Sequence, residues 1–375
     1  MKNLIFRCIT LACCCFGSLV LPLQAQAGQL DTWASQPSGT TNDFFAVAYG
    51  NGTFVAVGTN GLLHSSTDGV SWTPQSSGTT NDLESITYGN GLFVAVGANG
   101  TVRTSTNGTT WAAQASGFGS AFHAVTYGNG RYVAVGFAGK IMTSTTATNW
   151  SFSNSSTTSS LQGVIWANGR FVACGSLGTL VTSPDGTNWT SQVSGSSIAL
   201  HALAYGAGTF VVAGFTGDLR TSPDGVTWTS QVSGTSNSLR GAIYTNSNFV
   251  LTAFHGTIIS SADGTNWVAR NSGVTDAVRG IAYGGGAFVT AGHNGRILRT
   301  VSLVAPTLTN ANFGGNTFNF SFTSVNGLTY AIEYKNNLND SGWTLLSTTN
   351  GTGGVIPIND LAVTVSRRYY RVGVQ

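Results

Sequence analysis

The sequence predicts an all-β protein: a seven-bladed β-propeller, closed by its N-terminal strand and followed by a small β-sandwich. Three observations support this. The chain has a strict internal repeat, contains only two Glu residues, and is rich in Val, Thr, Phe, Tyr and Trp, which favour strands. Of the 375 residues, 8% are charged, against about 25% in an average soluble protein. Hydrophobic residues make up 41% of the chain, so we expect a large core and little disorder.

The first 27 residues have the pattern of a secretory signal peptide. Lys2 and Arg7 form a positive end, an apolar stretch covers residues 8–23, and small residues precede a predicted cleavage site after Ala27. We therefore expect a protein that is secreted, periplasmic or held at the cell surface. A lipoprotein modified at one of the cysteines at 13–15 is the alternative. We expect no transmembrane segment, because no later stretch is long and apolar enough.

The predicted mature chain is almost neutral. It keeps 14 basic and 13 acidic residues, a net charge of +1, so no nucleic-acid partner is expected. Cys174 is the one cysteine of the predicted mature chain, so an intramolecular disulfide is excluded. We interpret it most simply as a core residue. We expect a monomer that binds no cofactor.

A tryptophan recurs every 39 residues, with no insertion between the repeats. Each repeat holds four short apolar segments separated by turns such as Asn-Gly and Asp-Gly, which accept positive φ and mark hairpins. Four strands in about 40 residues are typical of a propeller blade, although a solenoid could share the period. The seven tryptophans are Trp33, Trp72, Trp111, Trp150, Trp189, Trp228 and Trp267.

The ends of the repeat array predict how the ring closes. The chain enters with an outermost strand at Trp33 and leaves with a third strand at 296–300, so the N-terminal strand would complete the last blade. We therefore assign residues 28–304 to the propeller. Small residues recur at one position of the innermost strand, where blades crowd toward the axis, and aromatic residues further along are interpreted as core between blades.

Four segments share the pattern S-x-D-G-x-x-W: 65–72, 182–189, 221–228 and 260–267. The pattern resembles the Asp-box, or bacterial neuraminidase, repeat, although one residue is missing between Asp and Gly. The same run is similar to WD40-like and YVTN-like propellers and to propellers related to photosystem II assembly factors. The resemblance covers residues 33–302 and implies a fold, not an activity.

We interpret each Asp box as a hairpin device in which Asp caps the turn, Gly takes positive φ and Trp packs beneath. A calcium site is the alternative, but one carboxylate per box is too few for a cation that takes six to eight oxygens. No His and Cys spacing matches a metal site either, so we expect no metal.

Sialidases also carry Asp boxes. The resemblance would imply a cluster of three arginines, a tyrosine paired with a glutamate, and an acid. The repeats hold one Glu, Glu84, and no arginine cluster matches a family motif. Glycosidases usually need two carboxylates at a defined separation, so we expect that the protein is not an enzyme. The alternative is a sialidase-like hydrolase or lyase.

Two positions of the repeat vary in chemistry while their neighbours stay uniform: the start of the innermost strand, and the loop between the second and third strands. In a four-stranded meander both positions lie on the same face of the propeller. We predict that this channel face binds a ligand. Arg240 and Arg279 would clasp a carboxylate, sulfate or acidic sugar, and phenylalanines would offer an apolar surface. The alternative is a solvated channel mouth that tolerates any polar residue. The candidate residues at the start of the innermost strand are Phe45, Glu84, His123, Gln162, His201, Arg240 and Arg279. Those in the loop between the second and third strands are Phe137, Phe215, Phe254 and His293.

The repeat stops after about residue 301, and residues 305–375 alternate apolar and polar side chains, as in 318–322 and 368–372. This alternation predicts a small β-sandwich of six or seven strands. The segment resembles fibronectin-III-like modules that end secreted bacterial repeat proteins. The resemblance implies a spacer or a surface-attachment unit; a stabilising appendage is the alternative.

The predicted function is binding of an extracellular polysaccharide or an envelope protein through the channel face. A carbohydrate-active enzyme is one alternative. The other is an assembly factor for a membrane protein complex, as the photosystem-factor resemblance would suggest.

Overall fold

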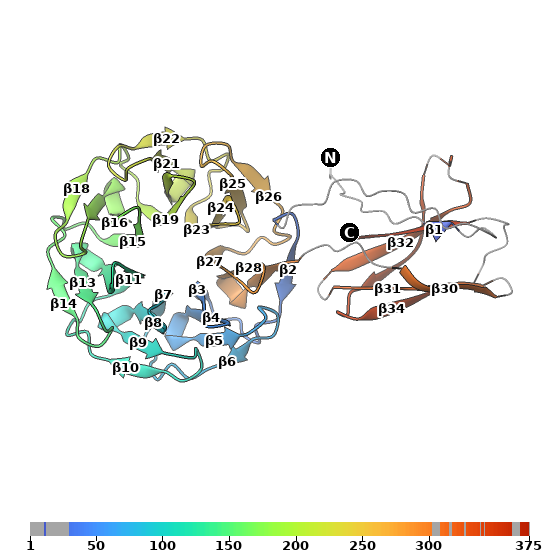
Figure 1. Cartoon of the computed structure of the whole chain (residues 1–375), viewed down its shortest axis with the longest axis horizontal. Coiled ribbons are helices and arrows are strands. Elements are labelled where there is room, and N and C mark those ends of the chain that lie inside the picture. The colour runs from blue at the N-terminus through green and yellow to red at the C-terminus, as the bar shows by residue number, and fades with distance from the viewer. Residues whose placement is uncertain are drawn as a thin grey trace. The chain divides into compact units, whose positions relative to one another are not determined.

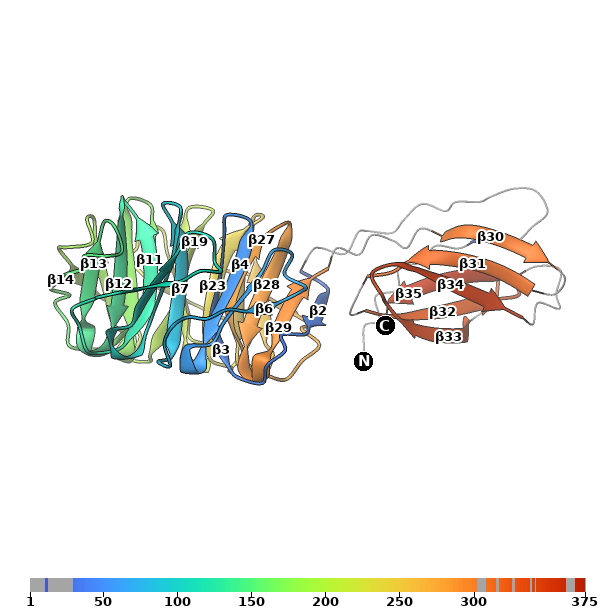
Figure 2. The ribbon, with the colours of Figure 1, turned by 90° about the horizontal axis from the view of Figure 1, so that it is seen from below.

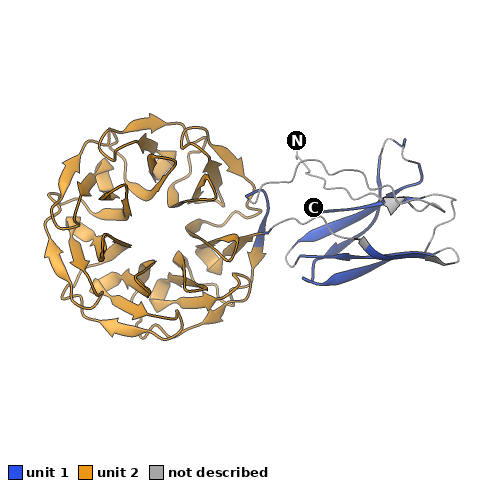
Figure 3. Ribbon diagram, viewed as in Figure 1, with its two compact units in different colours: residues 1–34, 301–375 blue, residues 35–300 orange. Residues whose placement is uncertain are grey.

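The structure is a computed structural model that describes residues 11–12, 30–301, 308–314, 317–325, 328–337, 339–340, 342–361 and 368–374. The chain divides into two compact units (Figure 3). One unit comprises residues 35–300, and the other comprises residues 1–34 and 301–375. Regular structure in the described residues consists of β-strands and short 3₁₀ turns. None of the described helices is long and apolar enough to cross a membrane.

Residues 33–300 form seven four-stranded antiparallel sheets, which we number in chain order. Sheet 1 contains β3 (Phe44–Gly50), β4 (Thr53–Gly58), β5 (Leu63–Ser66) and β6 (Thr73–Pro74). Sheet 2 contains β7 (Leu83–Gly89), β8 (Leu92–Gly97), β9 (Val102–Ser105) and β10 (Ala112–Gln114). Sheet 3 contains β11 (Phe122–Gly128), β12 (Arg131–Gly136), β13 (Ile141–Ser144) and β14 (Ser151–Ser153). Sheet 4 contains β15 (Leu161–Ala167), β16 (Arg170–Gly175), β17 (Leu180–Ser183) and β18 (Thr190–Gln192).

Sheet 5 contains β19 (Leu200–Gly206), β20 (Thr209–Gly214), β21 (Leu219–Ser222) and β22 (Thr229–Gln231). Sheet 6 contains β23 (Leu239–Thr245), β24 (Asn248–Ala253), β25 (Ile258–Ser261) and β26 (Val268–Arg270). Sheet 7 contains β27 (Val278–Gly284), β28 (Ala287–Gly292), β29 (Ile297–Thr300) and, from the start of the chain, β2 (Trp33–Gln36). The turns are η1 (Thr59–Gly61), η2 (Ala98–Gly100), η3 (Phe137–Gly139), η4 (Ser176–Gly178), η5 (Phe215–Gly217) and η6 (His293–Gly295).

The sheets stand in a ring, with their first strands innermost and their fourth strands outermost (Figure 1). Seen from the side, the strands run between the two faces of the ring (Figure 2). Each 3₁₀ turn follows the second strand of its sheet and lies against the first strand of the next sheet. The β2 strand pairs as the outermost strand of sheet 7, the position expected for the N-terminal strand.

The core lies between neighbouring sheets. One buried cluster joins Ala204 and Val211 of sheet 5 to Leu239, Phe249 and other residues of sheet 6. The repeated phenylalanine of the second strand is fully buried in these clusters, as the sequence predicts for core residues. The side chains at this position are Phe54, Phe93, Tyr132, Phe171, Phe210, Phe249 and Phe288.

Close approach of the first strands explains the small residues near the axis. A Cβ atom at Gly163 would lie 2.4 Å from the carbonyl oxygen of His201, on the next sheet. A Cβ at Gly241 would lie 2.1 Å from the Arg279 carbonyl oxygen and 2.4 Å from the Thr252 hydroxyl. These distances are far inside van der Waals contact, so any larger side chain must push neighbouring strands apart.

The Asp-Gly turns are held by hydrogen bonds to the Asp side chain. The carboxylate oxygen of Asp224 accepts hydrogen bonds from the backbone N–H groups of Val226 and Thr227 at 2.9 and 2.8 Å. Gly225 has φ +75°, and its carbonyl accepts a hydrogen bond from Nε1 of Trp228 at 3.2 Å. The boxes at Asp185 and Asp263 share these contacts, as does Asn107 in the turn of sheet 2.

The C-terminal unit contains two sheets. One orders β30 (Leu308–Gly314), β31 (Thr317–Thr323) and β34 (Val355–Asp360); the other orders β1 (Leu11–Ala12), β35 (Tyr369–Val374), β32 (Thr329–Lys335) and β33 (Thr344–Asn350). Both contribute to one buried cluster, which includes Phe320, Ile358, Ile332 and Tyr370. That the two sheets form a sandwich stays a prediction. Cleavage after Ala27 would remove β1.

We predict that Gly241→Ala destabilises the propeller by about 1–3 kcal/mol, because the added methyl group overlaps the Arg279 carbonyl. Denaturant unfolding of the mature chain measures the change. Gly119→Ala is the matched control, since its Cβ meets nothing within 4 Å. Equal stabilities of the two variants would contradict the close approach of the first strands.

We also predict that the Asp-Gly turns lose stability in acid. The hydrogen bonds from Thr227 and Val226 lower the pKa of Asp224 to about 2, below the value of about 3.9 in an unfolded chain. The carboxylate therefore stabilises the fold above pH 4, and this contribution disappears as the pH falls toward 2. Asp224→Asn should reduce the acid sensitivity while keeping the turn, as Asn107 does. An unchanged pH profile of the unfolding free energy would contradict this assignment.

Candidate binding site

The seven candidate residues of the first strands share one structural feature. Each first strand has a register shift at its start, so that one residue has no partner in the ladder. A β-bulge of this kind turns a side chain away from the regular alternation. The bulged residues are Phe45, Glu84, His123, Gln162, His201, Arg240 and Arg279.

All seven side chains line one central cavity of about 230 Å³. Larger hollows of about 860 and 570 Å³ lie elsewhere, at residues 35–42 with 294–296 and at 75–81. These two are open, and both are lined by the same Ser-Gly-Thr loop of different repeats, so we regard them as a feature of the repeat. Of these three hollows in the described residues, the central cavity is the one that gathers chemically different residues from every sheet.

The second candidate set lies at the same end of the sheets as the bulges. In sheet 5, the backbone N–H of Phe215 donates to the carbonyl of Ala199, two residues before His201, at 3.0 Å. The same hydrogen bond recurs in all seven sheets, including those of Phe137, Phe254 and His293. The structure therefore places the variable loops beside the starts of the first strands, as expected.

Arg240 is the centre of the most developed cluster. Its guanidinium carbon lies 4.6 Å from the ring centroid of Phe215 and 5.1 Å from that of Phe254, both cation–π contacts. Its Nη1 lies 3.1 Å from Nδ1 of His201. His201 also meets the Phe215 ring edge-on, with ring centroids 4.8 Å apart. Four of the predicted residues thus fix one another in place.

Arg279 lines the same cavity on the neighbouring sheet. Its guanidinium carbon lies 4.5 Å from the ring centroid of Phe45. Among the residues that the structure describes, neither Arg240 nor Arg279 forms an ion pair with a carboxylate. The buried Nε atom of Arg240 has no hydrogen-bond partner in this part of the chain.

The pKa values of Arg240 and Arg279 are both lowered, because the central cavity disfavours positive charge. Burial, reinforced by repulsion from Arg279, lowers the pKa of Arg240 to about 10. Burial also lowers the pKa of Arg279, although the negative charges of Glu84 and Asp43 oppose the shift. Both groups remain cationic near neutral pH. An anion in the cavity would relieve this repulsion.

His201 is a neutral donor in this setting. Burial, with the charges of Arg240 and Arg279, lowers its pKa to about 3. A guanidinium can only donate, so Nδ1 of His201 must accept the hydrogen bond and the proton must be on Nε2. That buried Nε2–H finds no acceptor among the described residues.

The remaining candidates form looser contacts. His123 lies 3.5 Å from the carboxylate of Glu84, and His293 lies 3.9 Å from that of Asp43. His293 also meets the ring of Phe254, with centroids 5.6 Å apart. Gln162 lines the cavity without a hydrogen bond to another described side chain.

Phe137 lies apart from the cluster around Arg240. It is 57% exposed and makes no ring or cation contact with another described residue, whereas Phe215, Phe254 and His293 do. None of these four loop residues is among those that line the cavity. Phe215 contacts Arg240 of the next sheet, whereas the sheet that follows Phe137 presents Gln162 at its bulge, so Phe137 has no arginine in the equivalent place.

Two apolar residues on this face were not among the residues predicted from the sequence. Leu177, in η4, is 76% exposed, and Ile198, just before β19, is 38% exposed. Aligning the repeats by their period of 39 residues would have found both, because other sheets carry mostly polar residues at these positions.

No group of three or more His, Cys, Asp or Glu side chains that could hold a metal ion occurs among the described residues. Cys174 is fully buried, and burial raises the pKa of its thiol well above the usual range. It is a core residue, as its place in the repeat predicts.

We predict that His201 does not titrate between pH 8 and 4.5. Because its folded pKa lies below the unfolded value of about 6.5, the unfolded state gains a proton first, and stability falls as the pH drops below about 6.5. Histidine NMR shifts measured against pH test this. In Arg240→Gln the pKa should rise, although burial still holds it below 6.5. A wild-type midpoint above 6 would contradict the assignment.

Comparison with known proteins places the fold. No family model matches the chain, and no curated protein matches it. A solved structure of YCF48 from Cyanidioschyzon merolae superimposes with a TM-score of 0.59 at 17% identity, covering 72% of this chain and 98% of that one. A structure of YCF48 bound to D1 peptide gives a TM-score of 0.60 at 18% identity, covering 74% and 96%. The WD40 β-propeller domain of Doa1 gives 0.56 at 12% identity, covering 72% and 96%. The predicted all-β propeller class is confirmed.

Proposed function

We propose that this chain is an exported, non-enzymatic binding protein whose propeller holds an acidic segment of another protein in the central cavity. The observation that carries the proposal is the pair of half-buried guanidinium groups, Arg240 and Arg279, which have no carboxylate partner among the described residues. The seven sheets would be the blades of a closed ring, and the bulged residues would form its binding surface.

Preorganisation would make this pair effective. Contacts with Phe215, Phe254 and Phe45 hold the two side chains, so little conformational entropy remains to be lost on binding. A carboxylate could accept two parallel hydrogen bonds from one guanidinium. It would also accept from the buried Nε of Arg240 and Nε2 of His201, which otherwise stay unpaired.

A protein ligand is supported by the similarity to a propeller solved with a bound peptide. This similarity favours the assembly-factor interpretation over polysaccharide binding, although an acidic polysaccharide presents the same carboxylate chemistry. Catalysis has weaker support. Among the described residues that line the cavity, Glu84 is the one carboxylate, and it lies near His123, so these residues do not provide the pair of carboxylates that a glycosidase usually needs.

We also propose that residues 1–27 direct export and are removed, and that the mature protein is a monomer. The C-terminal unit, residues 305–375, would be a β-sandwich of the fibronectin-III-like type that spaces or anchors the propeller. Size-exclusion chromatography with light scattering and N-terminal sequencing of the exported protein test these assignments.

The binding proposal predicts that an array of 12-residue peptides binds the mature chain through acidic members. Peptides with Asp or Glu should bind at least tenfold more tightly than their Asn or Gln counterparts, because the cavity presents two cations. The double variant Arg240→Gln/Arg279→Gln should remove this preference.

The double variant Arg103→Gln/Arg299→Gln is the control, since it removes the same two positive charges outside the cavity. There Arg103 donates to the backbone carbonyls of Ser77 and Gly78, and Arg299 donates to that of Asp68. A glycan array probed in parallel tests the second candidate. Binding to acidic glycans alone would favour a polysaccharide ligand. Peptide binding that survives in the double variant would overturn the proposed site.

A further inference from the structure

Exposed apolar side chains lie in turns and loops beside the starts of the first strands, at the same end of the sheets as the bulged residues. Eight large hydrophobic side chains are exposed in the described residues 30–301, and all of them lie between 137 and 268. Two of these, Leu177 and Ile198, lie between Phe137 and Phe215 in the order of the sheets. We call Phe137, Leu177, Ile198 and Phe215 the apolar arc.

Backbone contacts connect the arc from sheet to sheet. The turn η3, which starts with Phe137, lies against β15, and η4, which contains Leu177, lies against β19. Ile198 immediately precedes Ala199, whose carbonyl accepts the N–H of Phe215 at 3.0 Å. Phe215 contacts Arg240 in turn. The arc therefore leads to the guanidinium pair from one side.

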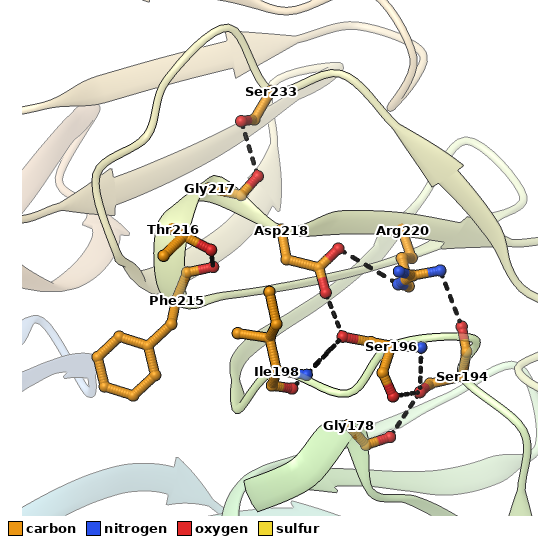
Figure 4. A network of polar contacts seen from close by, with 10 residues as sticks. All are labelled: Gly178, Ser194, Ser196, Ile198, Phe215, Thr216, Gly217, Asp218, Arg220 and Ser233. Atoms are coloured by element: carbon orange, nitrogen blue, oxygen red, sulfur yellow. Dashed lines mark hydrogen bonds and ion pairs between the residues drawn. The ribbon is translucent and has the colours of Figure 1, made fainter.

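The loop that presents Ile198 is held in place by a network of hydrogen bonds (Figure 4). The backbone N–H of Ile198 donates to the Ser196 hydroxyl at 3.0 Å, and that hydroxyl donates to the carboxylate of Asp218. Arg220 lies 3.3 Å from Asp218 and donates to the carbonyl of Ser194 at 3.2 Å. The hydroxyl of Ser194 donates to the carbonyl of Gly178, beside Leu177, at 2.6 Å. This network connects the turn that carries Leu177 to the loop that carries Ile198.

Neither backbone preference nor core packing accounts for Leu177. It has φ +57°, a left-handed conformation that suits Asn or Gly and that Leu rarely adopts, yet the side chain is 76% exposed. Sheets 1, 2 and 7 carry Asn at this position. Ile198 is also apolar at a position where the other sheets carry polar residues. The equivalent residues are Asn42, Asn81, Ser120, Ser159, Asn237 and Asp276.

We propose that the apolar arc and the guanidinium pair form one extended groove for a linear peptide that carries apolar side chains beside an acidic group. This inference rests on the proposed function and adds the chemistry of the ligand. Charge complementarity fixes the acidic group at Arg240 and Arg279, and the arc then receives the neighbouring apolar residues. A polysaccharide would leave the aliphatic side chains of Leu177 and Ile198 unexplained.

Selection of random 12-residue peptides displayed on phage against the mature chain tests this inference. Enriched peptides should combine Asp or Glu with two or more large apolar residues at a constant spacing. The arc variant Phe137→Ser/Leu177→Asn/Ile198→Asn should keep the acidic preference and lose the apolar one. Each substitution introduces a residue type that other sheets carry at that position, so the turns should be retained.

A resynthesised peptide from the selection should bind the arc variant at least tenfold more weakly, and replacing its apolar residues by Ser should weaken binding to the wild type similarly. Leu177→Asn alone should not lower the melting temperature, which separates a binding role from a structural one. Acidic peptides without an apolar pattern, or equal affinity for the arc variant, would overturn this inference alone. Failure to enrich any peptide would overturn the proposed function as well.

Discussion

The close approach of seven first strands around one axis is the constraint on which the rest of the structure depends. At Gly163 and Gly241 the neighbouring strand lies so near that even a methyl group would collide with its carbonyl oxygen. Only small side chains fit at this position of the ladder, where the other sheets carry Ala, Ser or Gly. The register shift at the start of each strand solves this, because it releases one residue from the ladder and turns it into the central cavity.

Different positions of the repeat therefore contribute to stability and to ligand recognition. Positions such as Phe210 and Phe249 are the same in nearly every sheet and form the core between sheets. The buried clusters between the described sheets include none of the bulged residues, so the chemistry of the bulged position can change without loss of core packing. Arg240, His201 and Phe215 use this freedom to build a small cluster whose buried donors have no acceptor among the described residues.

Much of this arrangement could be predicted from the sequence, because a fixed period places equivalent residues at equivalent positions. The tryptophan spacing located the strands, and the contrast between variable and uniform positions identified the side chains that line the cavity. Contacts between repeats could not be predicted in this way. The period does not show that Arg240 lies between two phenylalanine rings, or that Phe137, in the same repeat position, points away into solvent. Those outcomes depend on which charge occupies the next sheet.

The central claim is that Arg240 and Arg279 form an anion site, and the melting temperature of the mature chain in increasing glutarate tests it most directly. Chloride at the same ionic strength controls for screening. A ligand that binds only the folded state raises the melting temperature with its concentration. The account predicts a rise with glutarate that is absent with chloride and absent in Arg240→Gln/Arg279→Gln. An equal response of the wild type and the double variant would contradict it.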